Sequence, residues 1–187
     1  MSEDHSGEIA DRYRRRAAAF TARVEAVSDD RWSSPTPCER WSVAELVAHV
    51  AEAAGLFLAL VDRQPPPAPS AADDPVGAWL ASRDAIVDGL ADPAVARLEY
   101  EGELGQATFE MAIDRFASTD LVLHTWDLSR AAGLDERLDP DDVHQIFEAM
   151  RPVDEMLRRS GSFGPKVEPP DGADEQTRLL AFLGRRV

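Results

Sequence analysis

Apolar residues recur every three or four positions along most of this chain, a spacing that predicts amphipathic helices. The first stripe runs from about Gly7 to Val27 and consists of Ile9, Tyr13, Ala17, Phe20, Val24 and Val27. A second helix begins sharply at Ser42, because Ser42 and Glu45 form a capping box that satisfies free backbone N–H groups. This helix ends before Gln64–Pro69, where four prolines prevent helix formation.

The same spacing predicts four further helices, over about Asp74–Leu90, Thr108–Ala132, Asp139–Arg159 and Ala173–Leu183. Between them, Val95–Glu101 has an extended character and is followed by Gly102 and Gly105, which favours one small β-hairpin. Long amphipathic helices with short or proline-rich links predict an all-α fold. We expect an up-and-down four-helix bundle with extra short C-terminal helices, forming a single domain over residues 1–187.

Composition narrows the classes of partner and compartment. The formal net charge of −15 argues against binding to nucleic acid or to an anionic membrane surface. The longest apolar run, Val43–Val61, contains Glu45, His49 and Glu52, so it is read as a buried helix rather than a membrane span. The N-terminus has no signal-peptide pattern and the chain has a single cysteine, so a cytoplasmic location is expected.

Three polar residues fall on helix faces that the pattern marks as buried. The predicted inward stripe of the fourth long helix reads Phe109, Ile113, Phe116, Asp120 and His124, followed by Asp127 or Leu128. His49 occupies the corresponding face of the second helix. An unpaired buried carboxylate costs several kcal/mol, so we expect a partner to compensate for Asp120.

A divalent metal ion on His49, Asp120 and His124 would compensate for all three groups at once. Three protein ligands also leave coordination positions open for water or a small molecule. Zinc is the first expectation, and nickel, iron or manganese accept the same ligands. The alternatives remain open: His49 fits an ordinary core or edge histidine, and Asp120 with His124 fits a simple i,i+4 ion pair.

Two motifs around these residues resemble those of a known family. The segment TPCERWSVAELVAHV, residues 36–50, resembles the first motif of the DinB-like superfamily in its actinobacterial branch. That branch includes the metal-binding domain of mycothiol-dependent maleylpyruvate isomerase. The segment DLVLHTWDLSRAA, residues 120–132, resembles the second motif, and LLAFLGRR near the end is similar to how such chains end.

The resemblance implies a DinB-like bundle with a metal on three side chains. The histidine of the first motif maps to His49, and the acidic residue and histidine of the second map to Asp120 and His124. The isomerase has glutamate where this chain has Asp120, so we expect the ion to lie nearer the helix that carries Asp120 or to be bound differently. Every basic residue except Lys166 is arginine, a bias typical of GC-rich genomes such as those of actinobacteria, which make mycothiol.

The resemblance predicts a metal-dependent thiol S-transferase or isomerase that uses mycothiol as cosubstrate and acts on a small electrophile. The alternatives are a non-enzymatic bundle that binds metal or a small ligand, and a metal-free bundle used for protein contacts. Monomer and homodimer both remain open.

Several residues near the motifs are weaker candidates. Asp127 fits either an acceptor for the second ring N–H of His124 or a solvated aspartate near the helix end. Trp41 and Trp126 fit either pocket walls or plain packing. Arg130 and Arg40 are candidates for holding an anionic substrate. Cys38 fits a small loop or core residue better than a nucleophile, because no activating group is evident near it in sequence.

Overall fold

The computed structural model describes residues 3–38, 41–102, 105–159 and 163–187. The chain divides into two compact units, Met1–Leu134 and Asp135–Val187. The prediction of a single domain over residues 1–187 is not tested by this division and stays a prediction. None of the described helices has both the length and the apolar character that a bilayer crossing requires.

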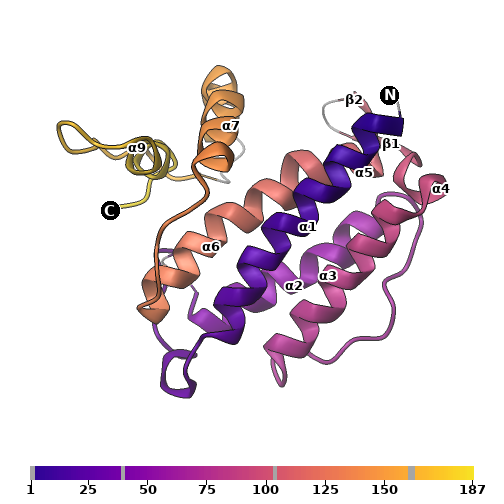
Figure 1. Cartoon of the computed structure of the whole chain (residues 1–187), viewed down its shortest axis with the longest axis horizontal. Coiled ribbons are helices and arrows are strands. Elements are labelled where there is room, and N and C mark those ends of the chain that lie inside the picture. The colour runs from indigo at the N-terminus through magenta and orange to yellow at the C-terminus, as the bar shows by residue number, and fades with distance from the viewer. Residues whose placement is uncertain (1–2, 39–40, 103–104, 160–162) are drawn as a thin grey trace. The chain divides into compact units, whose positions relative to one another are not determined.

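The first unit is a four-helix bundle with a small hairpin, as the sequence predicts (Figure 1). Its long helices are α1 (Glu3–Glu25), α2 (Val43–Ala59), α3 (Pro75–Ala91) and α6 (Ser118–Ala132). Helix α6 is preceded without a break by α5 (Phe109–Ala112) and a π-helical turn, η2 (Ile113–Ala117). The short elements are η1 (Asp29–Arg31), α4 (Pro93–Ala96) and the antiparallel strands β1 (Glu99–Gly102) and β2 (Gly105–Thr108).

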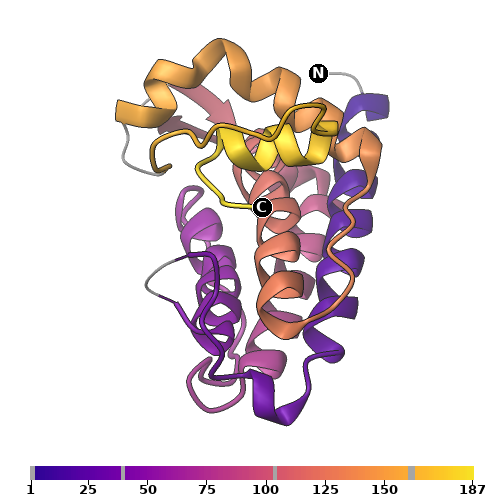
Figure 2. The ribbon, with the colours of Figure 1, turned by 90° about the vertical axis from the view of Figure 1, so that its left-hand side faces the viewer.

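The long helices contact one another in a closed ring. Helix α6 packs against both α1 and α2, and α3 packs against the same two helices from the other side. In Figure 2, α6 runs between α1 and α2. Helix α2 begins with the predicted capping box, in which Ser42 and Glu45 each bond the other's backbone N–H. The two flanks of α6 therefore meet different neighbours, α1 on one side and α2 on the other.

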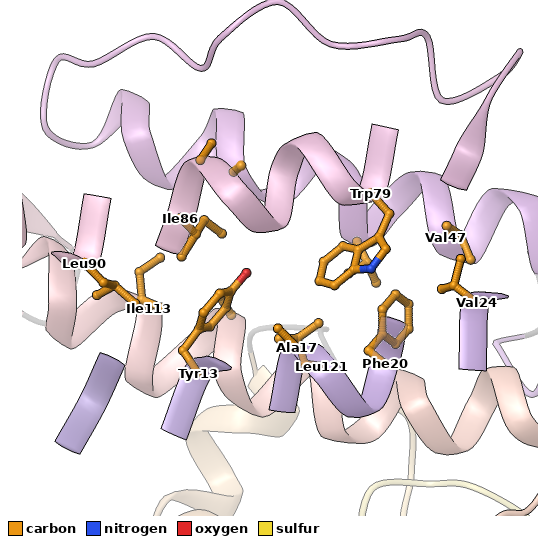
Figure 3. Close-up of a cluster of buried hydrophobic side chains, with 14 of the residues drawn as sticks. Tyr13, Ala17, Phe20, Val24, Val47, Trp79, Ile86, Leu90, Ile113 and Leu121 are labelled. Carbon is orange, nitrogen blue, oxygen red and sulfur yellow. The ribbon is translucent and has the colours of Figure 1, made fainter. Parts of the chain in front are cut away.

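Trp79 of α3 anchors the core of the bundle (Figure 3). Its ring meets Phe20 of α1 edge to face, with centroids 4.8 Å apart. Its indole N–H donates to the Thr21 hydroxyl at 3.0 Å, so the buried polar atom is satisfied. The same core extends along the bundle through Tyr13, Ile86, Leu90 and Ile113.

The π turn changes which residues of the fourth predicted helix face inward. The Ser118 N–H bonds the carbonyl of Ile113, five residues back, so one extra residue is inserted before α6. The apolar stripe therefore continues through Phe109, Ile113, Ala117, Leu121 and Leu128. The prediction that Phe116 lies on the buried stripe is wrong, since Phe116 is exposed. Asp120 and His124 consequently lie on the flank of the stripe instead of in its centre.

The second unit is built from short helices: α7 (Pro140–Met150), η3 (Arg151–Val153), α8 (Asp154–Arg159) and α9 (Glu175–Phe182). The predicted continuous helix from Asp139 to Arg159 is interrupted by the 3₁₀ turn at Pro152. Proline lacks a backbone N–H and its ring clashes with the preceding turn, so α7 ends at Met150. Phe147 of α7 meets Phe182 of α9 with ring centroids 5.6 Å apart, which links the two helices.

Candidate metal centre

The structure brings His49, Asp120 and His124 together between α2 and α6. The Nε2 atom of His49 lies 3.6 Å from Oδ2 of Asp120. The Nε2 atom of His124 lies 3.3 Å from Oδ1 of the same carboxylate. One ligand atom from each residue can be chosen so that all three lie within 4.8 Å of one another. Two imidazoles and a carboxylate from two separate helices therefore converge on a single point.

The donor set fits a divalent metal ion in both chemistry and spacing. Tetrahedral zinc binds nitrogen and oxygen at about 2.0–2.2 Å, which places neighbouring donor atoms about 3.4 Å apart. The nitrogen–oxygen separations of 3.3 and 3.6 Å, each to a different oxygen of Asp120, lie close to that spacing. The same set of nitrogen and carboxylate donors is accepted by nickel, iron and manganese.

The three residues differ in exposure, which corrects the expectation that all of them are buried. The His124 side chain is only 6% exposed, whereas Asp120 and His49 are 41% and 42% exposed. For Asp120 the physical reason is the π turn, which rotates it away from the centre of the core. His49 lies outside the buried face of α2. The cluster thus has a protein-covered side at His124 and a solvent side at His49 and Asp120.

The buried ring of His124 lies between two carboxylates. Its Nε2 faces Asp120, and its Nδ1 lies 3.0 Å from Oδ2 of Asp127, a fully buried residue. Asp127 is therefore not a solvated aspartate, and it occupies the place of an acceptor for the second ring N–H. Since each carboxylate presents lone pairs to a ring nitrogen, each nitrogen needs a proton or a metal ion.

Charge interactions in the cluster favour the ionised forms. Burial by itself raises the pKa of Asp120, but the neighbouring His124 and His49 outweigh it and hold this pKa well below its usual range. Burial by itself lowers the pKa of His124, whereas Asp120, Asp127 and Cys38 raise it well above its usual value. The site is thus preorganised to hold positive charge beside Asp120.

Cys38 completes this buried network, and its position is not evident from the sequence. Its thiol donates to Oδ2 of Asp127, with sulfur and oxygen 3.5 Å apart. Cys38, His124 and Asp127 form a second group whose ligand atoms lie within 4.8 Å of one another. The contact joins residues 89 positions apart, so no local sequence pattern predicts it.

A short loop before α2 sets the positions of Cys38 and Trp41. The Thr36 hydroxyl donates to the Trp41 carbonyl at 2.8 Å and accepts the Cys38 N–H at 3.2 Å. The Trp41 ring stacks on His49, with centroids 4.3 Å apart and planes 29° apart. Trp41 therefore covers one face of the His49 ring and restricts its rotation.

The remaining candidates from the sequence are Trp126, Arg130 and Arg40. Trp126 is fully buried, and its indole N–H has no hydrogen-bond partner among the described residues. The Arg130 guanidinium lies over the Trp126 ring, 5.3 Å from its centroid. The prediction that Arg130 holds a substrate anion stays a prediction. Arg40 lies outside the described residues.

Comparison with known proteins identifies the family. The family model described as the mycothiol maleylpyruvate isomerase N-terminal domain matches residues 13–129, more than half of the chain. The chain belongs to this family. The match contains His49, Asp120, His124 and Asp127, so the cluster lies inside the family domain. The family is DinB-like and related to mycothiol, as the two sequence motifs predict.

Relatives of similar length also occur. Two are "Uncharacterized protein MT0763" of Mycobacterium tuberculosis strain CDC 1551 / Oshkosh and "Uncharacterized protein Rv0738" of strain ATCC 25618 / H37Rv. Each is 29% identical over 180 residues, covering 94% of this chain and 96% of the relative. No solved structure matches the chain.

Proposed function

We propose that this protein is a divalent-metal-dependent thiol S-transferase or isomerase that uses mycothiol as its thiol and acts on a small electrophile. The observation that carries the proposal is the convergence of His49, Asp120 and His124 at metal-ligand spacing inside the family domain. The membership in a mycothiol-related family supports the choice of thiol. Zinc is the metal we expect first, because imidazole and carboxylate ligands suit it.

The exposure of the cluster suits catalysis better than a purely structural role. Structural zinc sites are usually closed by four protein ligands, whereas catalytic sites keep a position for water or substrate. Here three protein donors meet, and the side formed by His49 and Asp120 is open to solvent. A small thiol and its electrophile can therefore approach from that side.

The metal ion and the residues around its ligands have distinct roles in this proposal. A divalent ion supplies a Lewis acid that lowers the pKa of a thiol or water, for zinc-bound water to roughly 7. Asp127 accepts a hydrogen bond from Nδ1 of His124 and so leaves the Nε2 lone pair free to bind an ion held beside Asp120. Trp41 holds the His49 ring by stacking and shields one of its faces from water.

The proposal is tested by measuring thiol consumption. The purified protein is loaded with zinc and mixed with mycothiol and a panel of epoxides, halogenated compounds and maleyl-type acids. We expect turnover of at least one class by the wild type and its loss in a His49→Gln, His124→Gln double variant. The matched control is His144→Gln, since His144 is an exposed histidine of the second unit.

Two outcomes would contradict the proposal. If the wild type takes up no stoichiometric metal, the cluster is a hydrogen-bonded network without a metal function. If it binds metal but consumes no thiol across the panel, the protein is a metal-binding module and not an enzyme.

A further inference from the structure

Three large apolar side chains are exposed on the described surface of the first unit. Leu56 is 70% exposed, Phe116 is 49% exposed and Leu60 is 41% exposed. Leu56 belongs to α2, Leu60 directly follows it, and Phe116 lies in the π turn that leads into α6. We refer to these three residues as the apolar ledge. All of them thus lie on or beside the two helical segments that carry the metal-ligand cluster.

Helix geometry places the ledge on the same faces as the cluster. Leu56 and Leu60 are seven and eleven residues after His49, spacings that return to the same face of a helix. Phe116 is four residues before Asp120, also close to one full turn. On each of the two helical segments, the residues of the ledge and those of the cluster therefore lie on the same face.

The relative direction of α2 and α6 puts both halves of the ledge at the same end of the cluster. Cys38, which precedes α2, contacts Asp127 in the later part of α6. Farther along α2, His49 meets Asp120, which lies earlier in α6. The helices are therefore antiparallel, and moving past His49 toward Leu56 is the same direction as moving from Asp120 back to Phe116.

The ledge also lies on the solvent side of the cluster. His49 is exposed and Asp120 half-buried, whereas His124 is covered by protein. The exposed apolar side chains and the exposed ligands thus lie on the same faces of the same two helical segments. Large apolar side chains exposed beside a ligand cluster are candidates for binding apolar groups.

We infer that the apolar ledge binds the body of the electrophile, so that the substrate is a small electrophile carrying an aromatic or branched aliphatic group. This inference rests on the proposed function and adds the substrate class. For an epoxide, the thiolate sulfur attacks a ring carbon, a C–S bond forms and a C–O bond breaks. The oxygen keeps the electron pair of the broken bond and takes a proton from solvent.

The first test compares two epoxides of the same reactivity class, styrene oxide and glycidol, with mycothiol and the zinc-loaded protein. We expect Leu56→Ser and Phe116→Ser each to lower the ratio of kcat/KM for styrene oxide over glycidol by about 10-fold or more. The matched control is Val153→Ser, which removes an exposed apolar side chain from the second unit and should leave the ratio unchanged. An unchanged ratio in both ledge variants would overturn the inference.

A second measurement does not depend on turnover. Binding of the unreactive 1-phenylethane-1,2-diol is followed by saturation-transfer NMR, with glycerol as the polar reference. Binding of the phenyl compound that is weakened about 10-fold by Leu56→Ser supports the ledge as a binding site, even if no thiol is consumed and the proposed function fails. Undetectable binding to the wild type overturns it.

The main competing occupant is a second copy of the chain. Sedimentation of the wild type and of the Leu56→Ser and Phe116→Ser variants distinguishes this case. A wild-type dimer that dissociates in both variants would assign the ledge to a subunit interface and overturn the inference. A sedimentation coefficient that is the same in all three proteins supports a small-molecule site.

Discussion

Polar side chains on the two flanks of α6 have different kinds of partner. On the flank toward α1, the Arg16 guanidinium donates to the Ser118 hydroxyl at 3.2 Å. Farther along the same pair of helices, Arg23 donates to the Ser129 hydroxyl at 3.1 Å. Here each arginine donates to a hydroxyl that can accept, so these contacts form without an added ion.

On the flank toward α2, the polar groups do not pair in this way. His49, Asp120, His124 and Asp127 present two carboxylates and two imidazoles, and a carboxylate faces each ring nitrogen of His124. A neutral imidazole carries one N–H, so the second nitrogen needs a further proton or a metal ion. All four side chains are of types that bind metals as well as form hydrogen bonds. A buried polar group is therefore informative about function only when its partners are also able to bind a further ion or proton.

The largest effect that separates the two flanks is expected from His124→Gln. This change removes the buried ligand of the cluster and leaves the core of the bundle intact. We expect the zinc affinity to fall by more than the ~10–100-fold that is typical for loss of an outer hydrogen-bond partner. Isothermal titration with zinc measures this, and unchanged affinity would remove His124 from the metal site.

Asp127→Asn tests the outer partner of the site. The amide no longer offers a charged acceptor to Nδ1 of His124, so the ring loses its fixed orientation. We expect the zinc affinity to fall by about 10–100-fold, with a folded bundle by circular dichroism. An affinity equal to that of the wild type would reduce Asp127 to a packing residue.

Arg16→Met tests the opposite flank. The apolar replacement leaves the buried Ser118 hydroxyl without this donor, so the free energy of unfolding should fall by about 1–3 kcal/mol. Zinc affinity should not change, since Arg16 lies on the flank toward α1. Urea denaturation and zinc titration on the same sample check both statements. A loss of metal binding equal to the loss of stability would show that the two flanks are not independent.

Cys38→Ala is expected to have a smaller effect on the same measurement. The change removes one weak S–H donor from Asp127 but keeps the contact between Asp127 and His124. We expect zinc affinity to fall by less than the ~10-fold lower bound for Asp127→Asn. Cys38→Ser, which keeps a donor, should lie between Cys38→Ala and the wild type. A loss larger than that of Asp127→Asn would make Cys38 a direct ligand.

His144 provides an exposed histidine–carboxylate pair for comparison with the buried cluster. Its hydrogen bond to Glu175 at 2.9 Å, together with the charge of that residue, raises the pKa of His144 above its usual value. The pair therefore stabilises the protein fully below about pH 6.5, and this stabilisation is lost as pH rises through the raised pKa.

We expect the smallest effect of the series for this pair, because both groups are solvent-exposed. The difference in Tm between wild type and His144→Gln should be largest at about pH 5.5 and should vanish at high pH. Thermal melts across this range check the sign. A difference that grows with pH would contradict the assignment of the pair.

The sequence was sufficient for the fold because the fold follows from local signals. The capping box at Ser42 and the proline-rich segment after α2 located that helix to within a few residues. The candidate ligands were also found from the sequence, since polar residues at His49, Asp120 and His124 interrupt apolar stripes. The sequence pattern did not predict the extra residue of the π turn, because no residue type is specific to such a turn.

This one insertion explains the errors on the helical segment that carries Asp120. It exposes Phe116 and turns Asp120 toward solvent, so the cluster lies at the edge of the core. The contact between Cys38 and Asp127 also could not be predicted from the sequence, because it depends on how a loop packs against a distant helix. The candidate ligands could therefore be named from residue types, whereas their accessibility required the three-dimensional structure.

The central claim is that His49, Asp120 and His124 bind one divalent ion, and anomalous diffraction from zinc-loaded crystals tests it most directly. We predict a single strong anomalous peak at the zinc edge, about 2.0–2.2 Å from Nε2 of both histidines and from an oxygen of Asp120. Crystals of zinc-loaded protein with no peak among these three residues, or with the peak between Cys38 and Asp127 instead, would contradict the claim.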